Sequence, residues 1–129
     1  MENLVVVETP KSFDDACRAL ERAIGEHRFG VLHVHDVHQT LASKGIPFDR
    51  PVRIFDVCNP QRAKQALEEN VLVAAALPCA IAVFTEGERT KFAFVRPTVM
   101  LGLFESPQLE GLAADVERAV RAIVERSAR

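Results

Sequence analysis

Apolar residues recur at helical spacing in two long segments of the chain. The first helix is predicted to follow Ser12, a suitable N-cap, with Asp15 at the third position of a capping-box-like arrangement. The second is predicted to open at Ser106-Pro107. The apolar stripes are Phe13, Ala16, Cys17, Leu20, Ile24 and His27 in the first helix, and Leu109, Leu112, Ala113, Val116, Val120, Ile123 and Val124 in the second. This period predicts two amphipathic helices that each bury one face.

Between these helices and before the first one, runs of β-branched and aromatic residues predict strands. We expect strands at 4–7, 29–37, 52–58 and 91–95, and a kinked strand over 71–84. The kink is expected at Pro78, because proline cannot donate to a central ladder. In the strand 29–37, simple alternation puts His33 and His35 on the same face as Val31.

Two short helices are predicted between the strands. One begins at Asp36, with Gln39 at the capping-box position, and ends at Gly45. The other is capped by Asn59 and runs from Pro60, which suits the first helical position, to about residue 70. The apolar segment 97–104 has no regular period, and it predicts a loop over the core, a flap over a pocket or a dimer contact.

The expected order is strand, helix, three or four strands with two short helical insertions, then a helix. Two amphipathic helices and one sheet predict a two-layer α+β sandwich, formed by a single domain over residues 1–129. Strands with one apolar and one mixed face suit a sheet that is covered on one side. We therefore expect a homodimer through an exposed sheet face or edge, with the segment 97–104 close to it.

Composition narrows the classes of partner and the compartment. The 129 residues are 48% hydrophobic and 26% charged, with a net charge of −2. No basic field attracts nucleic acid or an anionic membrane, and no apolar stretch approaches the length of a membrane span. Three cysteines without a CxxC motif, and an N-terminus without the basic region of a signal peptide, predict a cytoplasmic protein.

Two cysteines stand where an apolar extended run meets a proline, in Phe55-Asp56-Val57-Cys58-Asn59-Pro60 and in Leu77-Pro78-Cys79. Proline fixes the local direction of the backbone, so both cysteines are expected in defined places. Cys58 also precedes a helix N-terminus, where the dipole favours a thiolate. Cys58, Asn59, Pro78 and Cys79 are therefore candidates for a ligand pocket. Thiol chemistry and packing as small hydrophobes are the alternatives.

A second candidate site is the histidine group His33, His35 and His38. Alternate residues of a strand share a face, so His33 and His35 could hold one metal ion, with His38 or Asp36 completing the ligands. The alternative is a set of polar residues on an open sheet face. The sequence has no glycine-rich phosphate loop and no Ser-His-Asp arrangement that its spacing can support, and any cofactor is left unknown.

Cys58-Asn59-Pro60, the run from Ala63 to Leu67, and Ala76-Leu77-Pro78-Cys79 with the strand after it resemble the family catalogued as domain of unknown function 302. Phe29-Gly30-Val31-Leu32 and Asp36-Val37 with Thr40-Leu41 also match its pattern. The resemblance implies a fold similar to one half of the TATA-box-binding-protein fold: strand, helix, four strands, helix. It implies no established reaction, cofactor or catalytic residue. The chain departs from the pattern at Arg96, where an acid is commoner, and at His33 and His35.

These observations predict a small-ligand-binding or protein-interaction module that acts as a homodimer, without nucleic-acid or membrane partners. The alternative is a thiol- or metal-dependent enzyme that uses Cys58 and Cys79, or His33 and His35. A reactive Cys58 at neutral pH would favour the enzyme.

Overall fold

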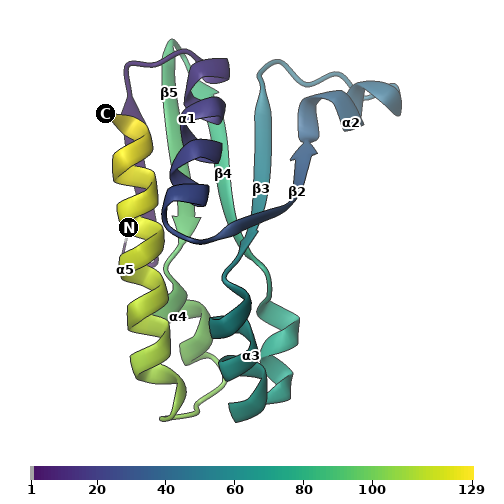
Figure 1. The fold of residues 1–129 in the computed structure, drawn as a ribbon. Helices are drawn as coiled ribbons and strands as arrows, with labels where there is room; N and C mark the ends of the chain where they lie inside the picture. Colours follow the sequence, from purple (N-terminus) through teal and green to yellow (C-terminus); the bar gives the residue numbers. More distant parts are fainter. Residues whose placement is uncertain (1) are drawn as a thin grey trace.

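The computed structural model describes residues 2–129 and contains a five-stranded antiparallel sheet in the order β1-β5-β4-β3-β2 (Figure 1). Its strands are β1 (Leu4–Thr9), β2 (Gly30–Asp36), β3 (Val52–Cys58), β4 (Cys79–Glu86) and β5 (Arg89–Val95). The helices are α1 (Phe13–Glu26), α2 (Val37–Ser43), α3 (Pro60–Glu69), the 3-10 helix η1 (Val71–Ala76), α4 (Pro97–Gly102) and α5 (Leu109–Ala128). The predicted α+β class and the order of its main elements are confirmed.

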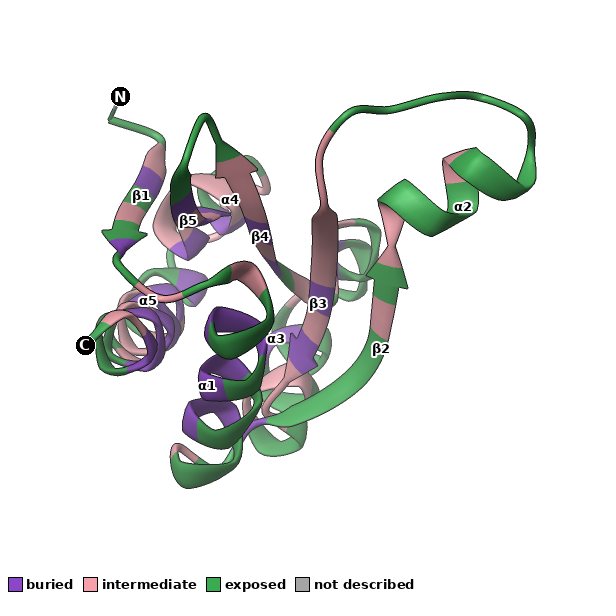
Figure 2. Cartoon of the chain, turned by 90° about the horizontal axis from the view of Figure 1, so that it is seen from above, coloured by how far each residue is buried: buried purple, intermediate pink, exposed green. Residues whose placement is uncertain are grey.

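Helices α1 and α5 cover one face of the sheet and form the main core with it (Figure 2). Helix α1 begins as predicted, because Ser12 Oγ accepts a hydrogen bond from the backbone N–H of Asp15 at 3.2 Å. The buried strand residues beneath the helices are Val5, Phe55, Val57, Ile81, Val83, Phe92 and Phe94. Cys17 lies in this core, as its place on the apolar stripe indicates, and burial raises the pKa of its thiol. Among residues 2–129, none of the helices has the length and apolarity that crossing a membrane would require.

A second, smaller core lies at one end of the sheet, where α3, η1, α4 and the start of α5 meet (Figure 1). Its buried residues are Ala66, Val73, Leu101, Leu109 and Ala113. The prediction of one kinked strand over 71–84 was wrong, because 71–76 is the 3-10 helix η1. Asn70 Oδ1 caps it by accepting from Leu72 N–H at 3.0 Å, and Pro78 precedes β4 rather than interrupting it.

The segment 97–104 is also more regular than predicted. It begins with the short helix α4, in which Pro97 takes the first helical position. Leu101 is buried in the second core and Phe104 packs against that core, whereas Leu103 is exposed. The segment therefore covers the molecule's own interior, and of these three side chains only Leu103 is available for a dimer contact.

The opposite face of the sheet is covered by neither α1 nor α5, and α2 lies beyond its β2 edge on this uncovered side (Figure 2). We call this the open face. One row of paired residues crosses all five strands: Val6, Ala93, Ala82, Ile54 and His35. The face is apolar at its centre, with small alanine side chains on the central strand β4 and on its neighbour β5.

The prediction that Val31 shares a face with His33 and His35 was wrong. The register of β2 against β3 shifts between Val31 and His33, which leaves Leu32 as the extra residue of a bulge. Val31 therefore lies opposite the buried Val57, on the core side, while His33 lies opposite Asp56 on the open face. Simple alternation cannot anticipate a bulge, because one inserted residue exchanges the two faces.

Candidate functional site

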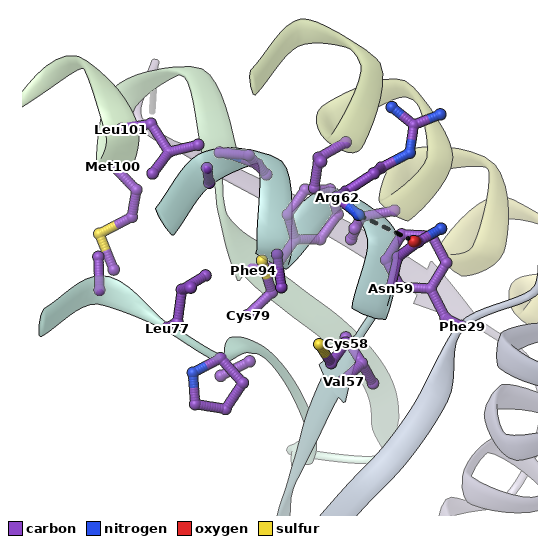
Figure 3. Close-up of a pocket in the computed structure, with 18 of the residues that line it drawn as sticks. Phe29, Val57, Cys58, Asn59, Arg62, Leu77, Cys79, Phe94, Met100 and Leu101 are labelled. Atoms are coloured by element: carbon purple, nitrogen blue, oxygen red, sulfur yellow. Dashed lines mark hydrogen bonds between the residues drawn. The ribbon is translucent and has the colours of Figure 1, made fainter. Parts of the chain in front are cut away.

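A cavity of about 120 Å³ lies at the end of the sheet, where β3 and β4 meet α3, η1 and α4 (Figure 3). All four residues predicted to form a ligand pocket, Cys58, Asn59, Pro78 and Cys79, contribute to its wall. The remaining wall residues are Phe29, Val57, Arg62, Ala63, Ala66, Ala76, Leu77, Ala80, Phe94, Val95, Pro97, Met100, Leu101, Leu112, Val116 and Val120. The wall is thus mainly apolar and joins the edges of both cores.

The local sequence explains why the cavity forms at this place. Val57 pairs with Cys79, so the end of β3 and the start of β4 lie side by side. Asn59 then stops the strand and caps α3, since its Oδ1 accepts a hydrogen bond from Arg62 N–H at 3.2 Å. Pro60 fits the first turn of α3 because its ring sets a helical φ and this position needs no N–H donor. Helix α3 leaves the sheet here, and the cavity occupies the space between them.

Replacing Asn59 by alanine is expected to lower the free energy of unfolding by about 1 kcal/mol, because the first turn of α3 loses its side-chain acceptor. Urea unfolding would measure the loss. The exposed Gln65 of the same helix provides the control, and Gln65→Ala should change stability by less than about 0.5 kcal/mol. Equal effects of the two substitutions would contradict the role of Asn59 as a cap.

The two thiols of the wall are half-buried and unpaired. Burial raises the pKa of the Cys58 thiol, opposite to the lowering expected from the helix N-terminus. Burial also raises the pKa of the Cys79 thiol, and the neighbouring Cys58 adds to that rise. Both residues are therefore mainly protonated at neutral pH, where they contribute weakly polar S–H groups to the wall.

Glu117 of α5 holds α4, and with it one side of the cavity, in position. Its carboxylate accepts hydrogen bonds from the backbone N–H of Thr98 at 3.1 Å, from Thr98 Oγ1 at 2.6 Å and from Arg96 Nε at 3.1 Å. Burial alone would raise the pKa of Glu117, but the bonds from Thr98 and Arg96 outweigh it and keep this pKa below its ordinary value. Arg96 is thus an anchor of this network.

Sequence reasoning missed Glu117, although a signal was present. Glu117 lies within the apolar stripe of α5, next to Val116 and between Ala113 and Val120 at helical spacing. An acidic residue within an apolar stripe is expected to be buried, and a buried carboxylate needs a charged or hydrogen-bonding partner. The position of Glu117 in the sequence therefore predicts a paired carboxylate.

His33 and His35 lie on the open face, and none of the three candidate histidines is among the residues that line the cavity. The rings of His33 and His35 meet edge to face with 4.4 Å between their centroids, and His35 Nε2 is 2.7 Å from Asp56 Oδ2. His38 belongs to α2. Within residues 2–129, no three or more histidine, cysteine, aspartate or glutamate side chains gather closely enough to hold a metal ion. Among the described residues, the fold therefore brings together no ligand set for the predicted metal site.

The structure is a two-layer α+β fold, in which helices cover one face of an antiparallel sheet and a cavity lies at the end of that sheet. The chain belongs to the family described as Domain of unknown function DUF302, whose model matches residues 5–127. It is similar to an uncharacterized conserved DUF302 protein from Bacillus stearothermophilus, known from a crystal structure, with 34% identity over 100% of both chains and a TM-score of 0.95. Comparison with curated proteins gives no match. The family resemblance predicted from the cysteine landmarks is confirmed.

Proposed function

We propose that this chain binds a small apolar molecule, or the apolar part of a larger one, in the cavity beside Cys58 and Cys79. The observation that carries the proposal is the apolar character of the wall, whose described residues include no histidine and no acidic residue. An apolar cavity of about 150 Å³ takes up benzene. A volume of about 120 Å³ is of the same order and suits an apolar body of about six non-hydrogen atoms. The free cysteines favour the reducing, cytoplasmic setting expected from the sequence.

The same wall disfavours the alternative of a thiol-dependent enzyme. A nucleophilic cysteine needs a lowered pKa or a base within hydrogen-bond reach. Burial raises the pKa of both thiols, and no histidine or carboxylate of residues 2–129 lines the cavity beside them. Binding rather than catalysis is the function that these contacts support.

Filling the cavity tests the proposal. We expect Ala63→Leu to weaken binding of toluene, used as an apolar probe, by at least about tenfold, because the larger side chain occupies space that the ligand needs. Titration calorimetry or ligand-observed NMR would measure the affinity. The same change at the exposed Ala42 of α2, away from the cavity, should leave binding unaltered. Absence of toluene binding at millimolar concentration would contradict the proposal.

We also propose that the chain acts as a homodimer that buries the open face. Small alanines at the centre of this face, Ala82 and Ala93, allow the close approach of a second flat surface. Most charges around them are paired within the face, since Arg89 binds Glu8 at 3.0 Å and Lys91 binds Glu86 at 2.6 Å, while Asp56 contacts His35 at 2.7 Å. A face of low net charge meets little like-charge repulsion from its own copy and offers little attraction to a highly charged partner.

A charge at the centre of the open face is expected to separate the dimer. Sedimentation equilibrium should report a dimer for the unmodified chain and a monomer for Ala82→Glu, because two buried carboxylates would face a desolvated apolar surface. Ala122 is an exposed residue of α5, the helix that packs on the other face of the sheet, so Ala122→Glu should remain dimeric. Circular dichroism would check that the variants fold. A monomeric unmodified chain, or a folded Ala82→Glu dimer, would refute this placement.

A further inference from the structure

The described side chains of the cavity wall carry positive charge and no negative charge. Arg62 is the one charged residue among the described side chains that line the cavity. The rest of the wall is apolar except for the amide of Asn59 and the thiols of Cys58 and Cys79. A cation at the margin of an apolar space interacts most favourably with an anion that reaches it from that space, because apolar surroundings strengthen the attraction.

The internal partner of Arg62 is shared with a second arginine. Nη1 of Arg62 lies 3.5 Å from Oδ2 of Asp115, and Arg118 makes a closer ion pair with the same carboxylate. One carboxylate between two guanidinium groups leaves one positive charge in excess. The pair of Arg62 with Asp115 is also half-exposed, so water weakens it. Arg62 can therefore bind another anion and lose little interaction energy with Asp115.

The other polar groups of the wall can donate hydrogen bonds to an anion. Asn59 uses its side-chain oxygen to cap α3, which leaves its NH2 group for a ligand. Burial raises the pKa of both wall thiols, so at neutral pH they carry S–H groups and no negative charge. Figure 3 shows the Arg62 side chain extending towards α5, with Asn59 beside it. Asn59 and Arg62 are neighbours at the start of α3, so their donors lie on one side of an otherwise apolar space.

We infer that the ligand is a small monocarboxylate, whose apolar body fills the cavity and whose carboxylate lies at the rim between Arg62 and Asn59. This inference rests on the proposed function and names the chemistry of its ligand. A guanidinium group binds a carboxylate through two parallel N–H···O hydrogen bonds, a geometry that a neutral amide cannot match. An aromatic ring of six carbons with one carboxylate has the required size and polarity.

Three probes of nearly the same shape separate charge from fit: benzoate, benzamide and benzamidine, which carry charges of −1, 0 and +1. Titration calorimetry should show benzoate binding about tenfold more tightly than benzamide, and benzamidine most weakly. Arg62→Gln should bring benzoate to the level of benzamide and leave benzamide unchanged. Asp115→Asn, which frees Arg62, should tighten benzoate. Arg126→Gln is the control, because it removes an equal charge from an exposed part of α5 away from the cavity.

Different results would overturn the carboxylate inference and the proposed binding cavity. Toluene or benzamide binding without a preference for benzoate would overturn the carboxylate inference and leave the apolar cavity as a binding site. A preference for benzoate that survives in a folded Arg62→Gln variant would also overturn the inference. If toluene and all three probes fail to bind at millimolar concentration, the proposed function and the inference both fall.

Discussion

Replacing Glu117 by glutamine is expected to lower the free energy of unfolding by about 3 kcal/mol. Glu117 is only 9% exposed and accepts charge-assisted hydrogen bonds from Thr98 and Arg96. Glutamine keeps one acceptor oxygen but turns an NH2 group towards donors, so at least one buried bond is lost and Arg96 loses its counter-ion. Chemical denaturation of the two proteins at neutral pH would give the difference. Because α4 forms part of the cavity wall, toluene binding should weaken as well.

The stability difference between the unmodified chain and Glu117→Gln is expected to decrease as the pH falls. The pKa of Glu117 is lower in the folded chain than its ordinary value of 4.5, so folding favours the ionised form. Its contribution is fully present above about pH 4.5 and is lost as the pH falls through the folded pKa. The stability gap to Glu117→Gln should therefore narrow in acid. An exposed acid of the same helix, replaced in Glu125→Gln, should show neither the loss nor the narrowing. A gap that stays constant down to the folded pKa and below it would exclude this assignment.

Replacing Leu101 by alanine is expected to cost about 3 kcal/mol of stability and to change which ligands fit. Leu101 is 8% exposed, belongs to the second core and lines the cavity. Its removal loses buried apolar area and leaves space that the surrounding helices fill only in part. The enlarged cavity should favour naphthalene over toluene more strongly than the unmodified chain does. Denaturation curves and titration of both ligands would measure the two effects.

Leu103 offers a control two residues further along. It is 74% exposed, so Leu103→Ala should alter stability by less than about 0.5 kcal/mol and leave the choice of ligand unchanged. Similar losses in the two variants would mean that α4 is held by its backbone rather than by the burial of Leu101. An unaltered ligand preference in Leu101→Ala would show that this side chain does not bound the binding space.

Local patterns predicted the elements whose signals lie within a few residues. Ser12, Asp36 and Asn59 each cap the helix expected from their spacing, and Gly45 follows α2 with a positive φ of 73° that glycine adopts without strain. The four candidate pocket residues meet in one wall for the same reason, since Cys58-Asn59 and Pro78-Cys79 end and begin neighbouring strands.

The features that were missed depend on contacts between distant segments. An apolar run such as 71–76 has no period that distinguishes a buried strand from a 3-10 helix. Its conformation depends on the packing of Val73 in the second core. The bulge in β2 is likewise set by pairing with β3. Arg62 is unremarkable in sequence, and its place at the rim follows from how α3 meets α5.

The strand order has a consequence for how the chain reaches this fold. Strands β2, β3, β4 and β5 pair with their neighbours in sequence, so the connections that this meander closes, including those that hold α2, α3 and η1, are far shorter than the whole chain. Strand β1 pairs with β5 instead, and α1 packs on α5, so both contacts join opposite ends of the chain. Closing so long a loop carries the larger entropic barrier, and it can be offset only after β5 and α5 are available. Because α5 contributes Leu112, Val116 and Val120 to the cavity wall, we expect the cavity to take its final shape only once α5 has packed.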